Sequence, residues 1–244
     1  EGIESLEDLR GEKVATPSLG NTQDVAARAY FADEGFTTDL EGGGDISIVP
    51  TDNPVIVNEF RDGNIAGAWV PEPWASILVA DGGTVLVDEA DVWKQTGGEF
   101  VTTHLLVNAD FLAEHEDLVR AVLQATVAAN DFIATDPETA RDVVGERVTE
   151  LTDAPLDDAV LADAWDNLTF TNDPIAASLE EDATDAAGVD LLDGLDQAPP
   201  VTDIYDLTLL NEVLAEAGDL RRFRHHRQFL KFCGMDLATV QSGL

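Results

Sequence analysis

The sequence predicts an α/β fold in which helices cover a largely parallel sheet. Three features of the chain support this prediction. Short apolar or alternating runs recur between residues 13 and 108, helix-periodic segments separate them, and glycine or proline stands at most of the junctions. Strands that alternate with helices at this rhythm pair in parallel and are buried on both faces.

The first half of the chain contains all the expected strands. Residues 13–17 form a short apolar run, and residues 45–49 alternate between polar and apolar side chains before Pro50. The further expected strands are 65–70, 84–88 and 100–108. Helices are expected at 21–32, 53–63 and 74–80, where apolar residues recur at helical spacing or a proline stands near the first position.

The second half of the chain is predicted to be mostly helical. Residues 109–134 carry apolar side chains that form one face of a long helix. Further helices are expected at 136–148, 156–168, 174–187 and 206–217. Asp136 is the expected N-cap of the first of these, because an aspartate side chain accepts hydrogen bonds from free amides at a helix start.

The charge of the chain is strongly negative. Its 13 lysine and arginine residues face 49 aspartate and glutamate residues, and the formal net charge is −36. The acidic residues are spread along the chain, which indicates adaptation to a high-salt medium, since the Debye length falls to about 3 Å at molar salt. The alternative is an ordinary acidic protein. Nucleic-acid binding is not expected, because phosphate contacts need basic patches.

Several other classes of protein and site are disfavoured. Cys233 is the single cysteine, so neither an internal disulfide nor a multi-cysteine metal site is expected, and we predict no metal or cofactor. No apolar run approaches the ~20 residues of a membrane-spanning helix. The sequence begins at Glu1 without a signal-like segment, from which we expect a removed signal or a fragment.

The residues after Gly218 differ in composition from the rest. Five of the 13 basic residues lie between Arg221 and Lys231, together with His225 and His226. Two interpretations stay open: a basic interaction tail, or a segment not selected with the rest of the chain, such as a shifted reading frame. Zinc binding by the two histidines is not favoured, because adjacent residues do not share a helix face.

Residues 16–24 are the first candidate ligand-binding segment. They lead from a strand end through a glycine turn into a helix start, where free backbone N–H groups and the helix dipole favour an anion. The segment holds no lysine or arginine, which suits reversible capture by neutral dipoles. Its candidate residues are Ser18, Gly20, Asn21, Thr22 and Gln23. The alternative is that Ser18 or Asn21 merely caps the helix.

Residues 67–74 are the second candidate segment. Trp69, Glu72 and Trp74 surround a Pro-x-Pro turn at the end of an expected strand. Ligands in open α/β sheets bind outside the carboxyl ends of the strands. An indole supplies an apolar wall and one N–H donor, and Glu72 would bind a ligand amine or hold the loop. For both tryptophans the alternative is ordinary packing in the core.

The third candidate pair is Thr102 and His104. On the expected strand these two side chains share a face. A hydrogen-bonded structural role is the alternative for the histidine. The chain contains neither a Gly-x-Ser-x-Gly elbow nor a His-Glu-x-x-His motif, and we predict no catalytic residues.

Four segments in order carry a more specific signal. They are residues 6–24, 63–74, 102–107 and 169–175. These segments resemble, in the family's order, the aliphatic sulfonate, taurine and nitrate binding proteins of ABC importers. The resemblance covers roughly residues 3 to 217. It maps the family's anion-holding turn onto Ser18, Gly20, Asn21 and Thr22, and its cleft loop onto Trp69, Glu72 and Trp74.

The resemblance implies a two-lobed periplasmic-binding-protein fold of the second type, whose first lobe is incomplete here. Residues 8–103 would form the second lobe with the cleft loops. Residues 104–217 would return, mostly as helices, to complete the first lobe, while residues 218–244 have no counterpart. Family members carry a further stretch of chain before the matched part. A ligand would bind in the cleft and close the lobes by a hinge motion.

The resemblance also implies a function. The chain would be a non-enzymatic binding protein for a small anionic solute such as an alkanesulfonate, taurine or nitrate. Its partners would be the membrane permease and ATPase of an ABC importer. We expect a monomer in an extracellular or periplasmic location, anchored to the membrane through an N-terminal signal that precedes this sequence.

Two other interpretations stay open. An enzyme on the same fold, similar to menaquinone-pathway dehydratases or pyrimidine-forming thiamin enzymes, would use Glu72 and His104 as acid–base groups. A non-functional, truncated gene product would account for both unusual ends of the chain.

Overall fold

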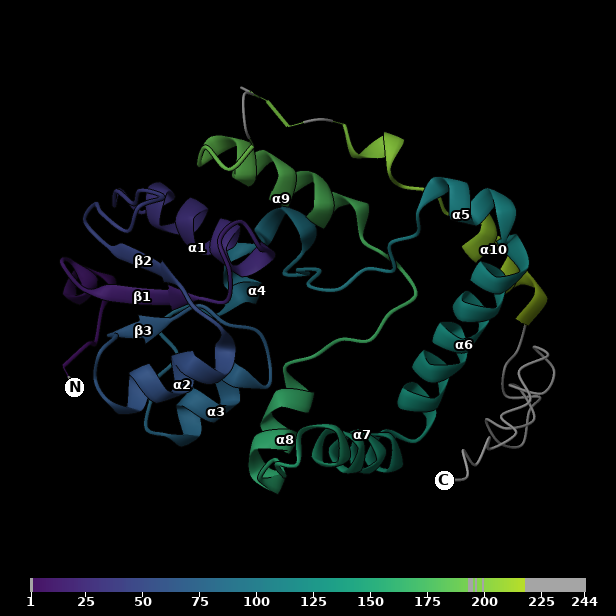
Figure 1. Cartoon of the computed structure of the whole chain (residues 1–244), viewed down its shortest axis with the longest axis horizontal. Helices are drawn as coiled ribbons and strands as arrows, with labels where there is room; N and C mark the ends of the chain where they lie inside the picture. The colour runs from purple at the N-terminus through teal and green to yellow at the C-terminus, as the bar shows by residue number, and fades with distance from the viewer. Residues whose placement is uncertain (1, 193–194, 196, 199, 218–244) are drawn as a thin grey trace, which may run out of the picture. The chain divides into compact units, whose positions relative to one another are not determined.

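The computed structural model describes residues 2–192, 195, 197–198 and 200–217 (Figure 1). The basic tail, with its two adjacent histidines and the single cysteine, lies outside the described residues. The chain divides into two compact units. Unit 1 comprises residues 1–103, 156–168 and 175–201, and unit 2 comprises residues 104–155, 169–174 and 202–244.

Unit 1 is built on a small open sheet of three parallel strands. β1 (Lys13–Thr16) lies in the middle, between β2 (Ser47–Pro50) and β3 (Gly67–Ala68). Parallel strands need a crossover, and here α1 (Thr22–Asp33) connects β1 to β2 while α2 (Asn53–Arg61) connects β2 to β3. Figure 1 shows these two helices on opposite sides of the sheet. The predicted α/β class with a parallel sheet is confirmed.

The two faces of the sheet carry separate hydrophobic clusters. Val14 and Ile48 pack with Phe31 of α1, whereas the next residue of β1, Ala15, packs with Ile56 of α2. This division follows from the strand geometry, because successive side chains of a strand point to opposite faces. Both faces are therefore covered, as expected for a parallel sheet.

Shorter elements surround the sheet in unit 1. They are η1 (Leu6–Leu9), α3 (Trp74–Ala80), α4 (Glu89–Val92), η2 (Lys94–Thr96), α8 (Asp158–Asp166) and α9 (Ala176–Gly188). α8 packs against α3, and α9 packs against α1. Residues 156–168 and 175–201, which carry these two helices, belong to unit 1. The expected return segment 104–217 stays a prediction about the lobes of the whole protein.

The regular elements of unit 2, within its described residues, are helices. Its elements are α5 (Ala109–Glu114), α6 (Glu116–Thr135), α7 (Pro137–Thr152) and α10 (Thr208–Ala217), and η3 (Val201–Asp203) spans the last boundary between the units. The single helix expected over 109–134 is broken at His115, whose φ of −137° and ψ of 42° are not helical. Across the α6–α10 contact, Arg120 pairs with Glu212 at 2.6 Å. None of the described helices combines the length and apolar character that crossing a membrane requires.

Two expected strands are missing from the part of the chain that the structure describes. Residues 84–88 and 100–108 form no ladder, and the strand expected at 65–70 is reduced to β3. Within the second of these runs, Leu106 is 85% exposed. A segment becomes a β-strand only when its backbone forms hydrogen bonds with a neighbouring strand. An apolar run in the sequence does not reveal whether such a neighbour is present.

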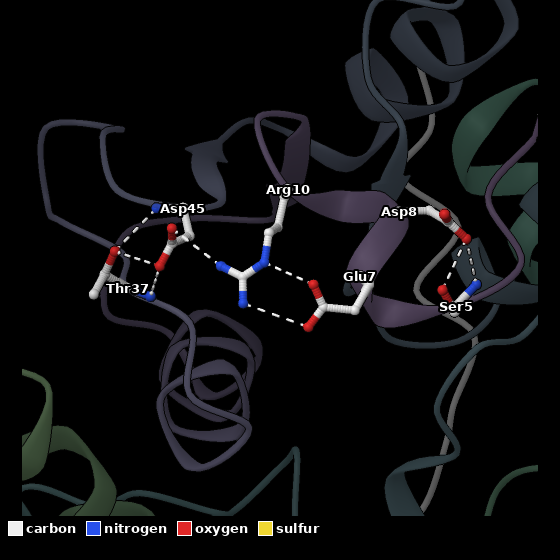
Figure 2. A network of polar contacts seen from close by, with 6 residues as sticks. All are labelled: Ser5, Glu7, Asp8, Arg10, Thr37 and Asp45. Atoms are coloured by element: carbon white, nitrogen blue, oxygen red, sulfur yellow. Dashed lines mark hydrogen bonds and ion pairs between the residues drawn. The ribbon is translucent and has the colours of Figure 1, made fainter.

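An exposed polar network ties the start of unit 1 to the loop before β2 (Figure 2). Arg10 donates from Nε to Glu7 at 2.7 Å and pairs with Asp45 at 3.1 Å. Hydrogen bonds from the Thr37 backbone N–H and hydroxyl lower the pKa of Asp45. Because these ion pairs are solvent-exposed, we assign them little stability.

Carboxylates gather where α9 packs against α1. Burial, together with repulsion from Glu181, Asp182 and Asp33, raises the pKa of Asp185 from 3.8 to about 7. Burial alone raises the pKa of Asp182 from 3.8 to about 6, and its Oδ1 is buried without a hydrogen-bond partner among the described atoms. Both pKa values lie above those of the unfolded chain, so the folded state binds more protons. The stability from these groups is fully present below pH 3.8 and is lost as the pH rises through about 6 and 7.

We predict that Asp185→Asn raises the melting temperature at pH 8 and flattens its decline between pH 4.5 and 8. The neutral amide removes a charge that burial and three nearby carboxylates disfavour. Thermal unfolding followed by circular dichroism at several pH values measures both effects. The matched control is Glu180→Gln, on an exposed position of the same helix. An unchanged pH dependence in Asp185→Asn would contradict the prediction.

Candidate functional site

The carboxyl ends of the three strands bring two of the predicted segments together. The chain leaves β1 at Thr16 and enters α1 through residues 17–21. Beside it, the backbone N–H of Trp69, just after β3, donates to the carbonyl oxygen of Ala15 at 2.8 Å. On the other side, the N–H of Thr51 donates to the carbonyl of Thr16 at 2.7 Å. The first two candidate segments therefore begin at one edge of the sheet, where open α/β sheets bind ligands.

The turn between β1 and α1 is organised by the side chain of Asp24. Its Oδ1 accepts a hydrogen bond from the hydroxyl of Thr16 at 2.7 Å, and its Oδ2 accepts one from the backbone N–H of Gly20 at 2.9 Å. Gly20 has a φ of +73°, a conformation that glycine adopts without strain. One carboxylate thus joins the strand end, the glycine turn and the helix.

Arg28 compensates the charge of this carboxylate. It lies one helical turn after Asp24 and donates from Nε to Asp24 Oδ2 at 3.0 Å. The exposed fractions of Asp24 and Arg28 are 0% and 1%. Arg28 also donates from Nη1 to the carbonyl oxygen of Asp39 at 2.8 Å. The sequence analysis missed both residues, although an acidic and a basic residue four positions apart signal a helical ion pair.

The donors expected to hold an anion lie at the start of α1. Asn21 is the N-cap, and its Oδ1 accepts from the N–H of Asp24 at 2.9 Å. The Nδ2 of Asn21 and the hydroxyl of Thr22 both donate to Gln23 Oε1 at 3.1 Å. The backbone N–H groups of Thr22 and Gln23 occupy the first two helical positions, which have no partner within the helix. The structure therefore combines the capping role of Asn21 with two amides at the helix start. Ser18 is exposed beside them.

Trp69 is packed and hydrogen-bonded within unit 1. Its ring lies 5.4 Å from that of Tyr30 and 6.1 Å from that of Phe31, measured between centroids. Its Nε1 donates to Glu89 Oε2 at 2.6 Å, so its indole donor is already engaged. Trp74 begins α3 and packs against the cluster on the α2 side of the sheet. For both rings these contacts match the core-packing alternative.

Glu72 holds its own loop. Its Oε2 accepts from the backbone N–H of Ser76 at 3.1 Å, and its Oε1 accepts from Asn167 Nδ2 at 2.7 Å. The peptide bond between Glu72 and Pro73 is cis. Both carboxylate oxygens thus connect α3 to the end of α8. Two roles were expected for Glu72, binding a ligand amine or holding the loop, and these contacts are of the second kind.

The third candidate pair is divided between the units. Thr102 is an exposed residue of unit 1, and His104 is the first residue of unit 2. His104 Nε2 lies 3.0 Å from the carbonyl oxygen of Pro174, also in unit 2. That contact is the structural role stated as the alternative for this histidine. Among the described residues, no group of three or more His, Cys, Asp or Glu side chains is placed to hold a metal ion.

A family model described as the NMT1-like family matches residues 3–146, which include the turn, the sheet and α1 to α6. The chain belongs to the NMT1-like family. The resemblance to the sulfonate, taurine and nitrate binding proteins is confirmed, and the matched range contains the motifs at 6–24, 63–74 and 102–107, whereas the motif at 169–175 lies outside it.

Relatives of this NMT1-like chain are named as binding or import proteins. A nitrate import ATP-binding protein of Synechocystis is 28% identical over 140 residues, which are 53% of this chain and 20% of that protein. The taurine-binding periplasmic protein of Escherichia coli is 28% identical over 136 residues, 56% of this chain and 40% of that protein. A putative binding protein of Brucella abortus is 23% identical over 148 residues, 60% and 44% of the two chains. The NMT1-like chain spans less than half the length of these relatives.

A second family model matches the other end of the chain. It is described as the transposase IS116/IS110/IS902 family and matches residues 206–244. This range includes the basic tail whose composition departs from the acidic remainder. The matched range also takes in α10, and so overlaps the end of the expected return segment 104–217.

We predict that Asp24→Asn destabilises unit 1 by about 3–5 kcal/mol, because it leaves the buried Arg28 without a counter-charge. Urea unfolding measures the loss. The double variant Asp24→Asn/Arg28→Met is expected to recover part of this loss. Removing both charges of a buried ion pair costs less stability than removing one charge and leaving the other buried without a partner. Glu34→Gln, an exposed carboxylate at the other end of α1, is the control and should change stability by less than about 0.5 kcal/mol. An Asp24→Asn loss as small as that of the control would contradict the prediction.

Proposed function

We propose that this NMT1-like chain is the ligand-holding part of a solute-binding protein that delivers a small oxyanion to an ABC importer. The start of α1 carries the proposal. The N–H groups of Thr22 and Gln23 lack helical partners there, and the Asp24 network holds the preceding turn in place. Backbone donors and the positive end of the helix dipole favour an anion at such a position.

The proposed ligand presents a weakly basic, singly charged oxyanion group, such as the sulfonate of an alkanesulfonate or of taurine, or nitrate. Arg28 is buried and paired with Asp24, so the donors offered to a ligand are neutral. On binding, Asn21 Nδ2 and the Thr22 hydroxyl would turn from Gln23 Oε1 toward the ligand oxygens. Neutral dipoles hold an anion less strongly than an exposed guanidinium, which suits a protein that must release its cargo. The relatives named for nitrate and taurine support this ligand class.

At the level of the whole protein, we propose the two-lobed arrangement of the second periplasmic-binding-protein type. Residues 8–103 would contribute the ligand-holding lobe, and parts of residues 104–217 would complete the other. The partners would be a permease and an ATPase, and the location periplasmic or extracellular, as the name of the taurine-binding relative supports. Trp69, Glu72 and Trp74 would shape the edge beside the ligand, while their polar atoms serve the protein's own contacts.

An enzymatic role for the candidate acid–base residues is disfavoured by their contacts. Both Glu72 oxygens accept internal hydrogen bonds, and His104 Nε2 contacts the Pro174 carbonyl. A general acid or base must instead reach a substrate proton. The putative and taurine-binding relatives are likewise named as binding proteins.

We predict that at least one of taurine, short alkanesulfonates and nitrate raises the melting temperature of the chain in molar salt. Binding to the folded state stabilises it by about 2.7 kcal/mol when the free ligand is 100 times the Kd. A thermal-shift panel at constant ionic strength measures the effect. If no member of the panel changes the melting temperature, the proposed function is wrong.

We further predict that Thr22→Pro abolishes that stabilisation without unfolding the protein. Proline is favoured at the first helical position and removes its N–H, and the extended backbone of Asn21 (φ −78°, ψ 170°) accepts a following proline. Thr22→Val, which removes the hydroxyl but keeps the amide, is the matched control and should retain part of the response. Full ligand stabilisation in Thr22→Pro would place the anion elsewhere.

A further inference from the structure

Glu89 accepts hydrogen bonds from two tryptophan side chains at once. Trp69 Nε1 donates to its Oε2 at 2.6 Å, and Trp93 Nε1 donates to its Oε1 at 2.8 Å. Burial raises the pKa of the carboxyl, against the opposing effect of the two indole donors. Among the described residues no lysine or arginine forms an ion pair with Glu89, so the indoles are what it binds.

The two tryptophans belong to different parts of unit 1. Trp69 stands at the carboxyl edge of the sheet, where its backbone N–H is bonded to Ala15 of β1. Trp93 follows α4, is 2% exposed and stacks on Phe100, with 4.5 Å between ring centroids and 22° between planes. Glu89 therefore joins the ligand edge of the sheet to residues 93–100.

Residues 93–100 lead directly to the first crossing of the chain into unit 2, between Thr103 and His104. After a first return over residues 156–168, the chain re-enters unit 1 at Ile175 and begins α9. The connection that leaves unit 1 after Thr103 and the one that re-enters it at Ile175 are tied to each other on the unit 1 side. The N–H of Val101 donates to Ser178 Oγ at 3.0 Å, and Gln95 Nε2 donates to Glu181 Oε1 at 2.9 Å.

We propose that Glu89 is a positioning residue that clamps the bases of these two connections, at 103–104 and 174–175, to the ligand edge of the sheet. A carboxylate suits this task because it offers two acceptor oxygens and no donor, and so receives two indole N–H groups. A glutamine has one acceptor oxygen, and its NH₂ group would face the second indole N–H. The clamp does not depend on which ligand binds, so it goes beyond the proposed function.

The four tryptophans allow a direct test, because each gives one indole N–H resonance in an NMR spectrum of the full chain. In Glu89→Gln we expect the indole resonances of Trp69 and Trp93 to shift and those of Trp74 and Trp165 to stay. Amide hydrogen exchange over residues 93–103 should become at least tenfold faster. The matched control is Asp91→Asn, an exposed carboxylate in the same short helix, which should change neither measurement. Unchanged exchange over 93–103 in a folded Glu89→Gln protein overturns the proposal.

A second variant separates the clamp from a general loss of stability. In a Trp93→Phe background, the single acceptor oxygen of a glutamine at position 89 needs to accept a hydrogen bond only from the Trp69 indole N–H. Adding Glu89→Gln there should therefore shift the Trp69 resonance far less than it does in the wild-type background. An equal shift in both backgrounds would contradict the clamp. Should Glu89→Gln not fold, the wild-type protein provides the test: the indole protons of Trp69 and Trp93 must exchange more slowly than that of Trp74. Wild-type ligand stabilisation, measured separately, tests the proposed function and leaves this result unaffected.

Discussion

The buried carboxylate of Asp24 is the constraint on which the rest of the site depends. It holds the Thr16 hydroxyl at the end of β1 and the Gly20 amide in the turn, and it lies in the first turn of α1. A negative charge so near a proposed anion site would repel the ligand if it stood alone. Arg28 neutralises it at 3.0 Å and is itself removed from solvent. The turn is thus built by a charge pair, and under the proposed function a ligand would meet only neutral donors.

The same edge of the sheet is stiffened by contacts between residues far apart in the chain. Glu72 connects α3 to Asn167 at the end of α8, and Glu89 connects Trp69 to Trp93. In each case both oxygens of the carboxylate accept hydrogen bonds from donors within the protein. Side chains that look from the sequence like a ligand-binding cluster therefore act as the frame around the α1 start. This distribution of roles leaves the backbone amides, and not a charged side chain, as the chemically distinctive feature of the edge.

How far the sequence predicts this structure depends on the range of the interactions involved. The α/β class, the 13–17 strand, the turn at Gly20 and the helices at 21–32 and 53–63 follow from local patterns, and the structure contains them within a few residues. The runs at 84–88 and 100–108 look equally strand-like, yet no partner pairs with them among the described residues. The partners of Glu72 and Trp69 lie 95 and 20 residues away, a separation that no local pattern encodes. Asp24 and Arg28 were within reach of prediction, because their spacing alone suggests a helical pair.

The strong acidity has a local counterpart in the packing of α9 on α1, where Asp33, Glu181 and Asp185 approach one another. Mutual repulsion at such a contact is reduced by salt. The central claim, however, concerns the start of α1. It is tested most directly by titrating the ¹⁵N-labelled chain with taurine and nitrate at constant ionic strength while following backbone amide resonances. We predict saturable shifts at Gly20, Thr22 and Gln23 for at least one of these anions. Saturable shifts elsewhere, with these three amides unmoved, would contradict the claim.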